Sequence, residues 1–367
     1  MTRLIVAAGG GGDAVAAAML HTALYGQAES AVIFTYAWER LLVDPVAGPR
    51  GPQDFLGLEP STPAVWFVPS GARPISPVGS TLPRLAAELP HSFALIDPRH
   101  GVEGIARQLG QIVHHLSPSS VDLLDVGGDI LARGDEPTLR SPLADALALA
   151  ACCRVDAPVR LLVAGPGLDG ELPVGDVRSR LGRLVHSFTP EDVEPVSSVL
   201  RWHPSEATGM LAAAAFGVRG VCEVRDAGLP IELTDASPTV HAADLEQTLA
   251  HNRLARAVMA TTTLEQAEAH SRAICGYSEI DYERDKASRL KAQPPAELDP
   301  RVVLAQLDRF EGEARRRGIT HTTFRRLTEV LNLSGSQRQD LRRFLISSRP
   351  GQYTAPLWRL AGSCHER

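Results

Sequence analysis

The sequence predicts an α/β fold with a doubly wound, mostly parallel sheet, followed by a small α-helical domain. The first observation is a set of short apolar runs that are typical of buried strands and end in Gly-rich turns. The second is that helical segments separate these runs, which favours parallel strands joined by crossover helices. With the turns that follow them, the predicted strands are residues 4–8, 31–36, 93–97, 121–129 and 159–171.

The first strand leads into the most informative stretch of the chain. Residues 4–8 are apolar, and an Ala-rich helix begins after the next five residues, which are Gly9, Gly10, Gly11, Gly12 and Asp13. A strand, a glycine loop and a helix start present backbone N–H groups and a positive helix end to an anionic group. Gly9, Gly11 and Ala14 also satisfy the G-x-G-x-x-A fingerprint of a Rossmann-like fold. A tight turn without a ligand is the alternative.

The second strand weakens the case for a nicotinamide cofactor. A dinucleotide-binding fold places an acid at the end of this strand to hold the ribose. Here Tyr36 and Trp38 stand at that point, and the nearest acid is Glu39. Because the expected acid is missing from the strand end, NAD(P) is less expected than a metal ion.

The connection after this strand is irregular. Residues 43–80 are rich in Pro and Gly and contain one strand candidate, residues 65–68.

The later elements continue the alternation. A helix runs to about residue 116, and another begins at Ser141, the predicted N-cap, with Asp145 in its first turn. Residues 203–208 open a helix that extends to residue 216, where Ser205 is expected to cap and Glu206 is a candidate general acid or base. Residues 221–225 and 230–234 are predicted as two closing strands.

Acidic residues recur where the predicted strands end. Because parallel strands bring their carboxyl ends to one edge of a sheet, we expect these side chains to converge there. So many acids need a cation, or substrate hydroxyls, to offset their repulsion, and Mg²⁺ or Ca²⁺ prefers oxygen ligands. The alternative is that each acid caps its own turn. The predicted catalytic residues are Asp125, Asp129 and Glu206. Asp125 and Asp129 are also the predicted metal ligands. The predicted substrate-binding residues are Gly9, Gly10, Gly11, Gly12, Asp13, Asp97, Asp169 and Glu171.

The last third of the chain differs in character. Residues 244–290 have a helical, mixed-charge pattern, and prolines mark a linker at 291–300. The predicted domains are therefore 1–290, a Rossmann-like body, and 301–367, a basic helical domain that resembles a helix-turn-helix unit. The latter carries a net charge of +7, from thirteen arginines and six acids. It is expected to cover the crevice or to supply an arginine such as Arg359 to an anionic substrate.

Composition excludes several classes of protein. The chain has 367 residues, 44% hydrophobic and 22% charged, and no apolar run long enough to span a membrane, so a cytoplasmic location is expected. Its five cysteines show no C-x-x-C spacing, which argues against structural zinc and disulfides. No lysine follows the glycines, so the loop is not a P-loop. The preference for Arg over Lys is typical of a GC-rich bacterial genome.

Several segments together resemble domain of unknown function family 1152 (DUF1152). They are residues 9–13, 97–104, 125–145 and 203–208, of which Asp-Val-Gly-Gly-Asp and Ser-Pro-Leu-Ala-Asp are the most specific. The resemblance covers roughly residues 1–285. It implies one Rossmann-like body and assigns no catalytic residue.

Three functions fit the sequence. The first is an enzyme of small-molecule metabolism that acts on a phosphorylated, nucleotide-like or nucleoside-like substrate by hydrolysis or group transfer. The alternatives are an NAD(P)-dependent oxidoreductase and a ligand-sensing DNA-binding regulator. A small molecule is the expected partner, a nucleic acid is less expected, and self-association into a homo-oligomer stays open.

Overall fold

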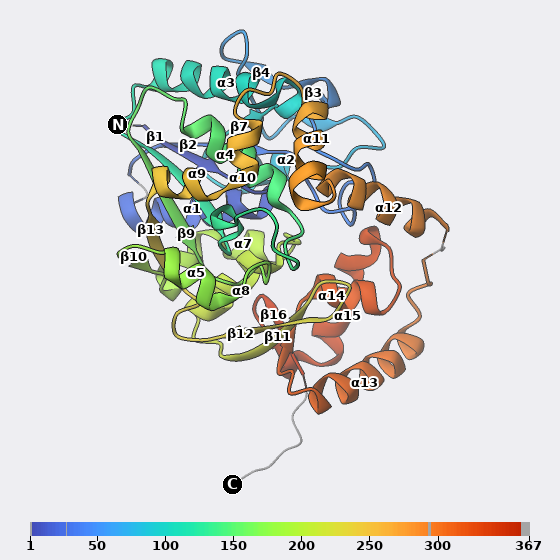
Figure 1. Cartoon of the computed structure of the whole chain (residues 1–367). Helices are drawn as coiled ribbons and strands as arrows, with labels where there is room; N and C mark the ends of the chain where they lie inside the picture. Colours follow the sequence, from blue (N-terminus) through green and yellow to red (C-terminus); the bar gives the residue numbers. More distant parts are fainter. Residues whose placement is uncertain (1, 27, 293–294, 361–367) are drawn as a thin grey trace.

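A computed structural model describes residues 2–26, 28–292 and 295–360. A nine-stranded mixed sheet forms the body (Figure 1). Its strands, in spatial order, are β10 (Leu184–Ser187), β13 (Thr239–Ala243), β9 (Val159–Ala164), β8 (Val121–Val126), β1 (Arg3–Ala7), β2 (Ala31–Tyr36), β7 (Ser92–Ile96), β5 (Trp66–Phe67) and β4 (Glu59–Pro60). The five central strands, β9 to β7, are parallel, as the sequence predicts.

The order of these strands creates a crevice. The chain runs from β1 outward through β2 to β7, then returns to β8 on the other side of β1 and continues to β9. The connections after β1 and β8 therefore leave in opposite directions, and ligands of open α/β sheets bind at such a switch point. Both strands end in predicted site residues.

Helices cover both faces of the sheet because its strands are apolar on both sides. In β1, Ile5 and Ala7 belong to one core cluster, while Leu4 and Val6 belong to the other. The first face is covered by α1 (Gly11–Tyr25), α2 (Leu82–Glu88) and α8 (Glu206–Ala215), and the second by α3 (Gly101–Leu116), α4 (Pro142–Cys152) and α10 (Arg253–Val258). The remaining helices of the body are α5 (Val174–Arg180), α6 (Pro190–Val193), α7 (Ser197–Leu200), α9 (Leu245–His251), α11 (Leu264–Cys275) and α12 (Glu279–Ala292).

A second sheet corrects the predicted topology. Residues 220–233 do not close the main sheet; they form a hairpin, β11 (Gly220–Val224) and β12 (Leu229–Leu233), that pairs with strands from the end of the chain. The five strands follow the order β12, β11, β14 (His321–Thr322), β16 (Leu357–Arg359) and β15 (Tyr353–Thr354). The strands that close the main sheet are β13 and β10. A hairpin's alternation does not reveal which sheet it joins.

The C-terminal segment forms three helices, close to those predicted, and these pack around the second sheet (Figure 1). They are α13 (Pro300–Arg316), α14 (Phe324–Val330) and α15 (Arg338–Ser348). Residues 293–294 of the predicted linker and residues 361–367 of the predicted domain lie outside the described residues. A two-stranded ribbon, β3 (Phe55–Leu56) with β6 (Arg73–Pro74), lies in the Pro- and Gly-rich connection. Among the described residues, no helix combines the length and apolarity needed to span a bilayer.

Candidate functional site

A cavity of about 120 Å³ lies at the carboxyl ends of β1, β8 and β9. The starts of α1, α4 and α8 all contribute residues to its wall. Carboxyl side chains far outnumber cationic ones in this wall. The acids are Asp13, Glu39, Asp125, Asp129, Asp145, Asp169, Glu171, Glu206, Glu279 and Glu283, and the arginines are Arg40, Arg225 and Arg325. The predicted convergence of acids at one edge therefore occurs for most of them.

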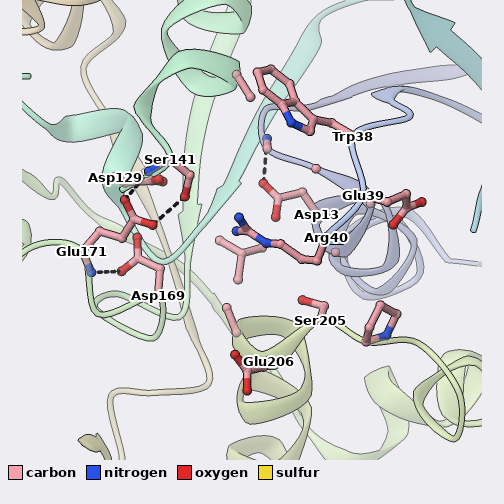
Figure 2. A pocket seen from close by; sticks show the side chains of 18 of the residues that line it. Asp13, Trp38, Glu39, Arg40, Asp129, Ser141, Asp169, Glu171, Ser205 and Glu206 are labelled. Atoms are coloured by element: carbon pink, nitrogen blue, oxygen red, sulfur yellow. Dashed lines mark hydrogen bonds between the residues drawn. The ribbon is translucent and has the colours of Figure 1, made fainter. Parts of the chain in front are cut away.

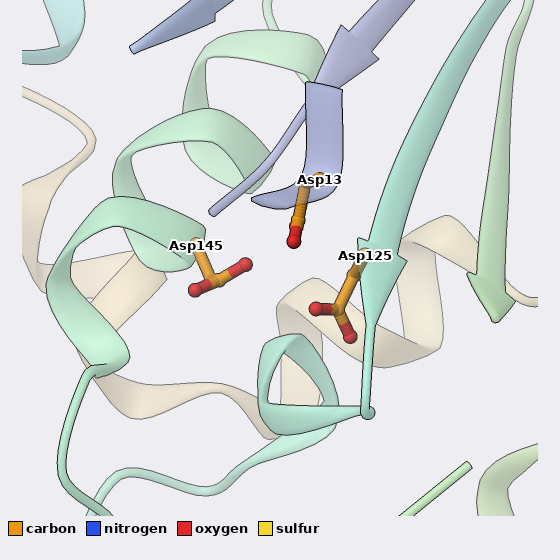
Figure 3. A group of neighbouring side chains, drawn as sticks. All are labelled: Asp13, Asp125 and Asp145. Atoms are coloured by element: carbon orange, nitrogen blue, oxygen red, sulfur yellow. The ribbon is translucent and has the colours of Figure 1, made fainter. Parts of the chain in front are cut away.

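Three aspartates form the centre of the acidic group (Figure 3). Asp13, Asp125 and Asp145 each offer one carboxylate oxygen, and these oxygens lie within 4.8 Å of one another. Asp125 is the fifth residue of β8, while Asp13 and Asp145 stand in the first turns of α1 and α4. Asp125 and Asp145 are 1% and 3% exposed, and Oδ2 of the former and Oδ1 of the latter have no hydrogen-bond partner among the described residues.

Burial and mutual repulsion disfavour ionisation of this cluster. Burial is the main cause that raises the pKa of Asp13 to about 7, although the N–H groups of Gly9 and Val126 lower it. The pKa of Asp125 lies well above its usual value because of burial and the charges of Asp13 and Asp169. Burial and the charge of Asp125 also raise the pKa of Asp145 well above its usual value. A cation in this position would remove the repulsion.

A second acidic group, Asp129, Asp169 and Glu171, lines the same cavity as Asp13 (Figure 2). Glu171 accepts hydrogen bonds from the Ser141 hydroxyl at 2.5 Å and the Ser141 N–H at 2.9 Å, and pairs with Arg225 at 2.9 Å. Burial raises the pKa of Glu171, but Arg225 and these donors outweigh it, and the net shift is downward. The predicted capping of α4 by the Ser141 side chain does not occur, because this side chain binds Glu171 instead.

Asp169 differs from its neighbour Glu171. Its Oδ1 accepts the Glu171 N–H at 3.1 Å, but its Oδ2 is buried without a hydrogen-bond partner among the described residues. Burial and the charge of Glu171 raise the pKa of Asp169 to about 7. Asp129 is 6% exposed, and burial together with Asp145 and Asp125 raises its pKa well above the usual value. Asp169 is therefore able to exchange a proton near neutral pH.

Glu206 lines the cavity but has little freedom to act as an acid or base. Its carboxylate accepts the Thr323 hydroxyl at 2.5 Å and the Arg225 N–H at 3.1 Å, and it pairs with Arg325 at 3.2 Å. These contacts join α8 to the C-terminal segment. Ser205 caps α8 as predicted, since its side chain accepts the Thr208 N–H.

The glycine loop forms one wall of the cavity. A Cβ atom on Gly10 would lie 2.5 Å from the Trp38 carbonyl oxygen, and one on Gly12 would lie 2.3 Å from the Ser205 hydroxyl oxygen. The loop therefore packs closely against two neighbouring segments, which side chains would prevent. Gly10 is the N-cap of α1 and provides no side-chain cap.

Arg40 and Arg325 are site residues that sequence reasoning missed. The Arg40 side chain extends into the space between Asp13 and Asp169 (Figure 2), and in the described part of the chain its guanidinium has no ion pair or hydrogen bond. Arg325 reaches the cavity from α14. Arg359 does not line the cavity; it is exposed and donates to the Gly351 carbonyl oxygen.

Asp97 does not join the other acids. It lies on the connection after β7, two strands away from β1, and its carboxylate binds the Arg99 guanidinium at 2.7 Å. Arg99 is only two residues further along, so Asp97 serves its own turn.

Asp145 is the opposite case, because an apparent helix-start acid belongs to the central cluster. It is the only charged residue of α4, which is otherwise apolar and is buried over its whole length, and that pattern could have revealed it.

The profile of a family described as a protein of unknown function, DUF1152, matches residues 4–287. The chain belongs to the DUF1152 family. The matched region contains the whole acidic group of the cavity and ends before α13. Arg325 thus comes from outside the DUF1152 region. No curated protein and no solved structure matches the chain.

Proposed function

We propose that this DUF1152 protein is an enzyme that hydrolyses, or transfers a group from, a phosphorylated, nucleotide-like or nucleoside-like substrate. The proposal includes a divalent cation, Mg²⁺, at Asp13, Asp125 and Asp145, and a Rossmann-like body that holds the substrate at its switch point. Of the two predicted metal ligands, the proposal retains Asp125 and replaces Asp129 with Asp13 and Asp145.

The observation that carries this proposal is the pair of unpartnered oxygens on Asp125 and Asp145. Buried carboxylate oxygens normally have hydrogen-bond partners. The carboxylates that carry them each place an oxygen within 4.8 Å of the other and of the Asp13 carboxylate. Oxygen ligands from separate elements suit Mg²⁺, which also keeps open positions for water and phosphate oxygens. When bound, such an ion would neutralise charge on a phosphoryl group.

The helix N-termini and Arg40 around the cavity favour an anionic substrate. The helices α1, α4 and α8 all direct their N-termini to it, and each N-terminus carries a partial positive charge. The guanidinium of Arg40 adds a positive charge between the glycine loop and the acids. A phosphoryl group lying there would contact backbone N–H groups and Arg40 while facing the aspartate cluster.

Asp169 is the residue that best fits proton transfer. A general acid or base is most effective when its pKa lies near the working pH, and the pKa of Asp169 is about 7. Its unpartnered Oδ2 is free to accept a proton from a water molecule or a substrate hydroxyl. In this assignment Glu206 has a positioning role and holds Arg325.

The experiment has two parts. Calorimetric titration of the metal-free protein with Mg²⁺ tests the cation site, and release of phosphate from p-nitrophenyl phosphate, ATP, AMP and ribose 5-phosphate tests the reaction. Asp125→Asn and Asp145→Asn should abolish both Mg²⁺ binding and turnover. Asp122→Asn is the matched control, because Asp122 is on the same strand and 2% exposed but pairs with Arg160 away from the cavity. The proposal is wrong if Mg²⁺ does not bind and the two variants turn over substrate like the wild type.

A nicotinamide cofactor is the second candidate because of Glu39. This acid follows β2 and approaches the glycine loop so closely that a Cβ atom on Gly11 would lie 3.2 Å from its carboxylate oxygens. That is the side of the loop on which a ribose would lie. Adding NAD and NADP to the titration separates the two functions.

A further inference from the structure

A second cavity lies against the first, between the start of α8 and the C-terminal segment. The two cavities share His203, Pro204, Ser205 and Arg325 as wall residues. The wall of the second one contains three arginines, Arg325, Arg338 and Arg342, and no Asp or Glu among its described lining residues. Its charge is therefore opposite to that of the acidic cavity.

We propose that this second cavity binds a small oxyanion, either free phosphate or the phosphate or carboxylate group of a larger ligand. The buried arginines are the first reason. Arg338 and Arg342 are 8% and 5% exposed, yet within the described residues neither forms an ion pair with a carboxylate. A buried charge without a counter-charge is costly, and an anion would supply what the protein does not.

Within residues 2–26, 28–292 and 295–360, the contacts of these two arginines are to neutral groups. Arg338 donates to the Trp202 carbonyl oxygen, and Arg342 donates to the Leu200 carbonyl oxygen at 3.5 Å and to the Tyr353 hydroxyl. The Arg342 guanidinium also lies 4.6 Å from the centre of the Phe324 ring. Burial and the charges of neighbouring arginines lower the pKa of Arg338 to about 10, which reflects an environment that an anion would relieve.

His203 provides the second, independent reason. Its Nδ1 accepts the Ser205 N–H at 3.3 Å, so the proton of the neutral ring is on Nε2. His203 is 8% exposed, and this Nε2 donor has no acceptor in the described part of the structure. Burial and the charge of Arg338 lower the pKa of His203 to about 3, so the ring is a neutral donor at physiological pH. The Nε2–H group of His203 thus lacks an acceptor, and the guanidinium groups of Arg338 and Arg342 lack a counter-charge. The oxygen atoms of an oxyanion would provide both.

This inference does not depend on the cation site. An anion would bind the arginine cavity whether or not the aspartates hold Mg²⁺, and inorganic phosphate in the presence of EDTA is therefore the probe. Isothermal titration of the full chain at constant ionic strength, balanced with NaCl, should give saturable binding. General exclusion of phosphate from the protein surface gives a linear effect instead.

Variants distinguish a built site from general charge. Arg342→Gln should weaken phosphate binding at least tenfold, and Arg342→Lys should weaken it as well, because lysine lacks the planar fork. Arg343→Gln is the control, since Arg343 lies on the same helix, α15, but is 80% exposed, pairs with Asp340 and does not line the cavity. Its phosphate affinity should equal that of the wild type.

The outcomes separate this inference from the proposed function. Asp145→Asn should lose Mg²⁺ binding and keep phosphate binding, so either site can fail alone. If Arg342→Gln does not fold, the lysine variant and the wild-type titration decide. The inference is overturned if phosphate shows no saturable binding to the wild type, or if the folded Arg342 variants bind it as tightly as the wild type.

Discussion

Replacement of Asp145 by asparagine should have opposite effects on stability with and without Mg²⁺. In the metal-free protein this change removes one of three carboxylates whose oxygens lie within 4.8 Å of one another. The free energy of unfolding should rise because repulsion falls. With Mg²⁺ present, the variant should lose a ligand and, with it, the stabilisation that the cation gives the wild type.

The magnitude follows from the geometry. Two unit charges separated by 4.8 Å repel by about 3.5 kcal/mol at an effective dielectric constant of about 20. Protonation limits this penalty, because burial and the charge of Asp125 raise the pKa of Asp145 well above its usual value and favour its neutral form. A buried amide with unmade hydrogen bonds costs about 1–3 kcal/mol. We therefore expect a net gain of about 1–2 kcal/mol for the metal-free variant, which is the repulsion less the cost of the amide.

Thermal unfolding at pH 8, in EDTA and in excess Mg²⁺, measures both effects. A cation at about a hundred times its Kd stabilises the wild type by about 2.7 kcal/mol, and the variant should show none of this. Asp122→Asn serves again as the control and should be destabilised equally under both conditions, because it breaks the ion pair with Arg160. An Asp145→Asn protein that is less stable than wild type in EDTA and still responds to Mg²⁺ would refute the reasoning.

Three further predictions concern the same cavity. The stabilisation by Mg²⁺ should grow as pH rises from about 4 to 7. Folded Asp13 keeps its proton up to about pH 7, whereas the unfolded chain releases it near 3.8, so the metal-free protein loses stability across that window. Calorimetry in several buffers should detect the protons released when Mg²⁺ binds. Asp169→Asn should lower kcat/KM by about 10²–10⁴ and remove the limb of the pH profile near 7, without changing Mg²⁺ affinity; an unchanged profile would exclude Asp169 as the base. Gly10→Ala should destabilise the protein by about 1–3 kcal/mol in urea unfolding, because the new methyl group would lie 2.5 Å from the Trp38 carbonyl oxygen, whereas Gly110→Ala, with open space around it, should not.

Local patterns explain why much of the body could be predicted. The apolar runs became β1, β2, β7, β8 and β9 because alternating side chains must be buried on both faces of a parallel sheet. The convergence of Asp13, Asp125, Asp129 and Asp169 followed from one geometric rule, that parallel strands share an edge for their carboxyl ends. The family was recognised from local sequence as well: of its two most specific segments, residues 125–129 lie at the end of β8 and residues 141–145 begin α4.

The sequence was least informative where a residue's role depends on its distant neighbours. Asp97 and Asp125 both follow apolar strands, but only Asp125 lies next to β1, and nothing local encodes that adjacency. Glu206 has the sequence context of a reactive helix-start acid, yet Thr323 and Arg325 fix it from more than a hundred residues away.

The sequence by itself therefore determined the parallel core, the glycine loop and the edge at which the acids gather, because these depend on periodicity, backbone freedom and strand direction. Only the tertiary structure decided which acids form the central cluster, that the hairpin β11–β12 joins the C-terminal strands, and that the arginines of this segment turn inward to a cavity. The physical reason is that strand order and packing bring together residues far apart in the chain, and it is those neighbours that set each side chain's burial, charge and hydrogen bonds.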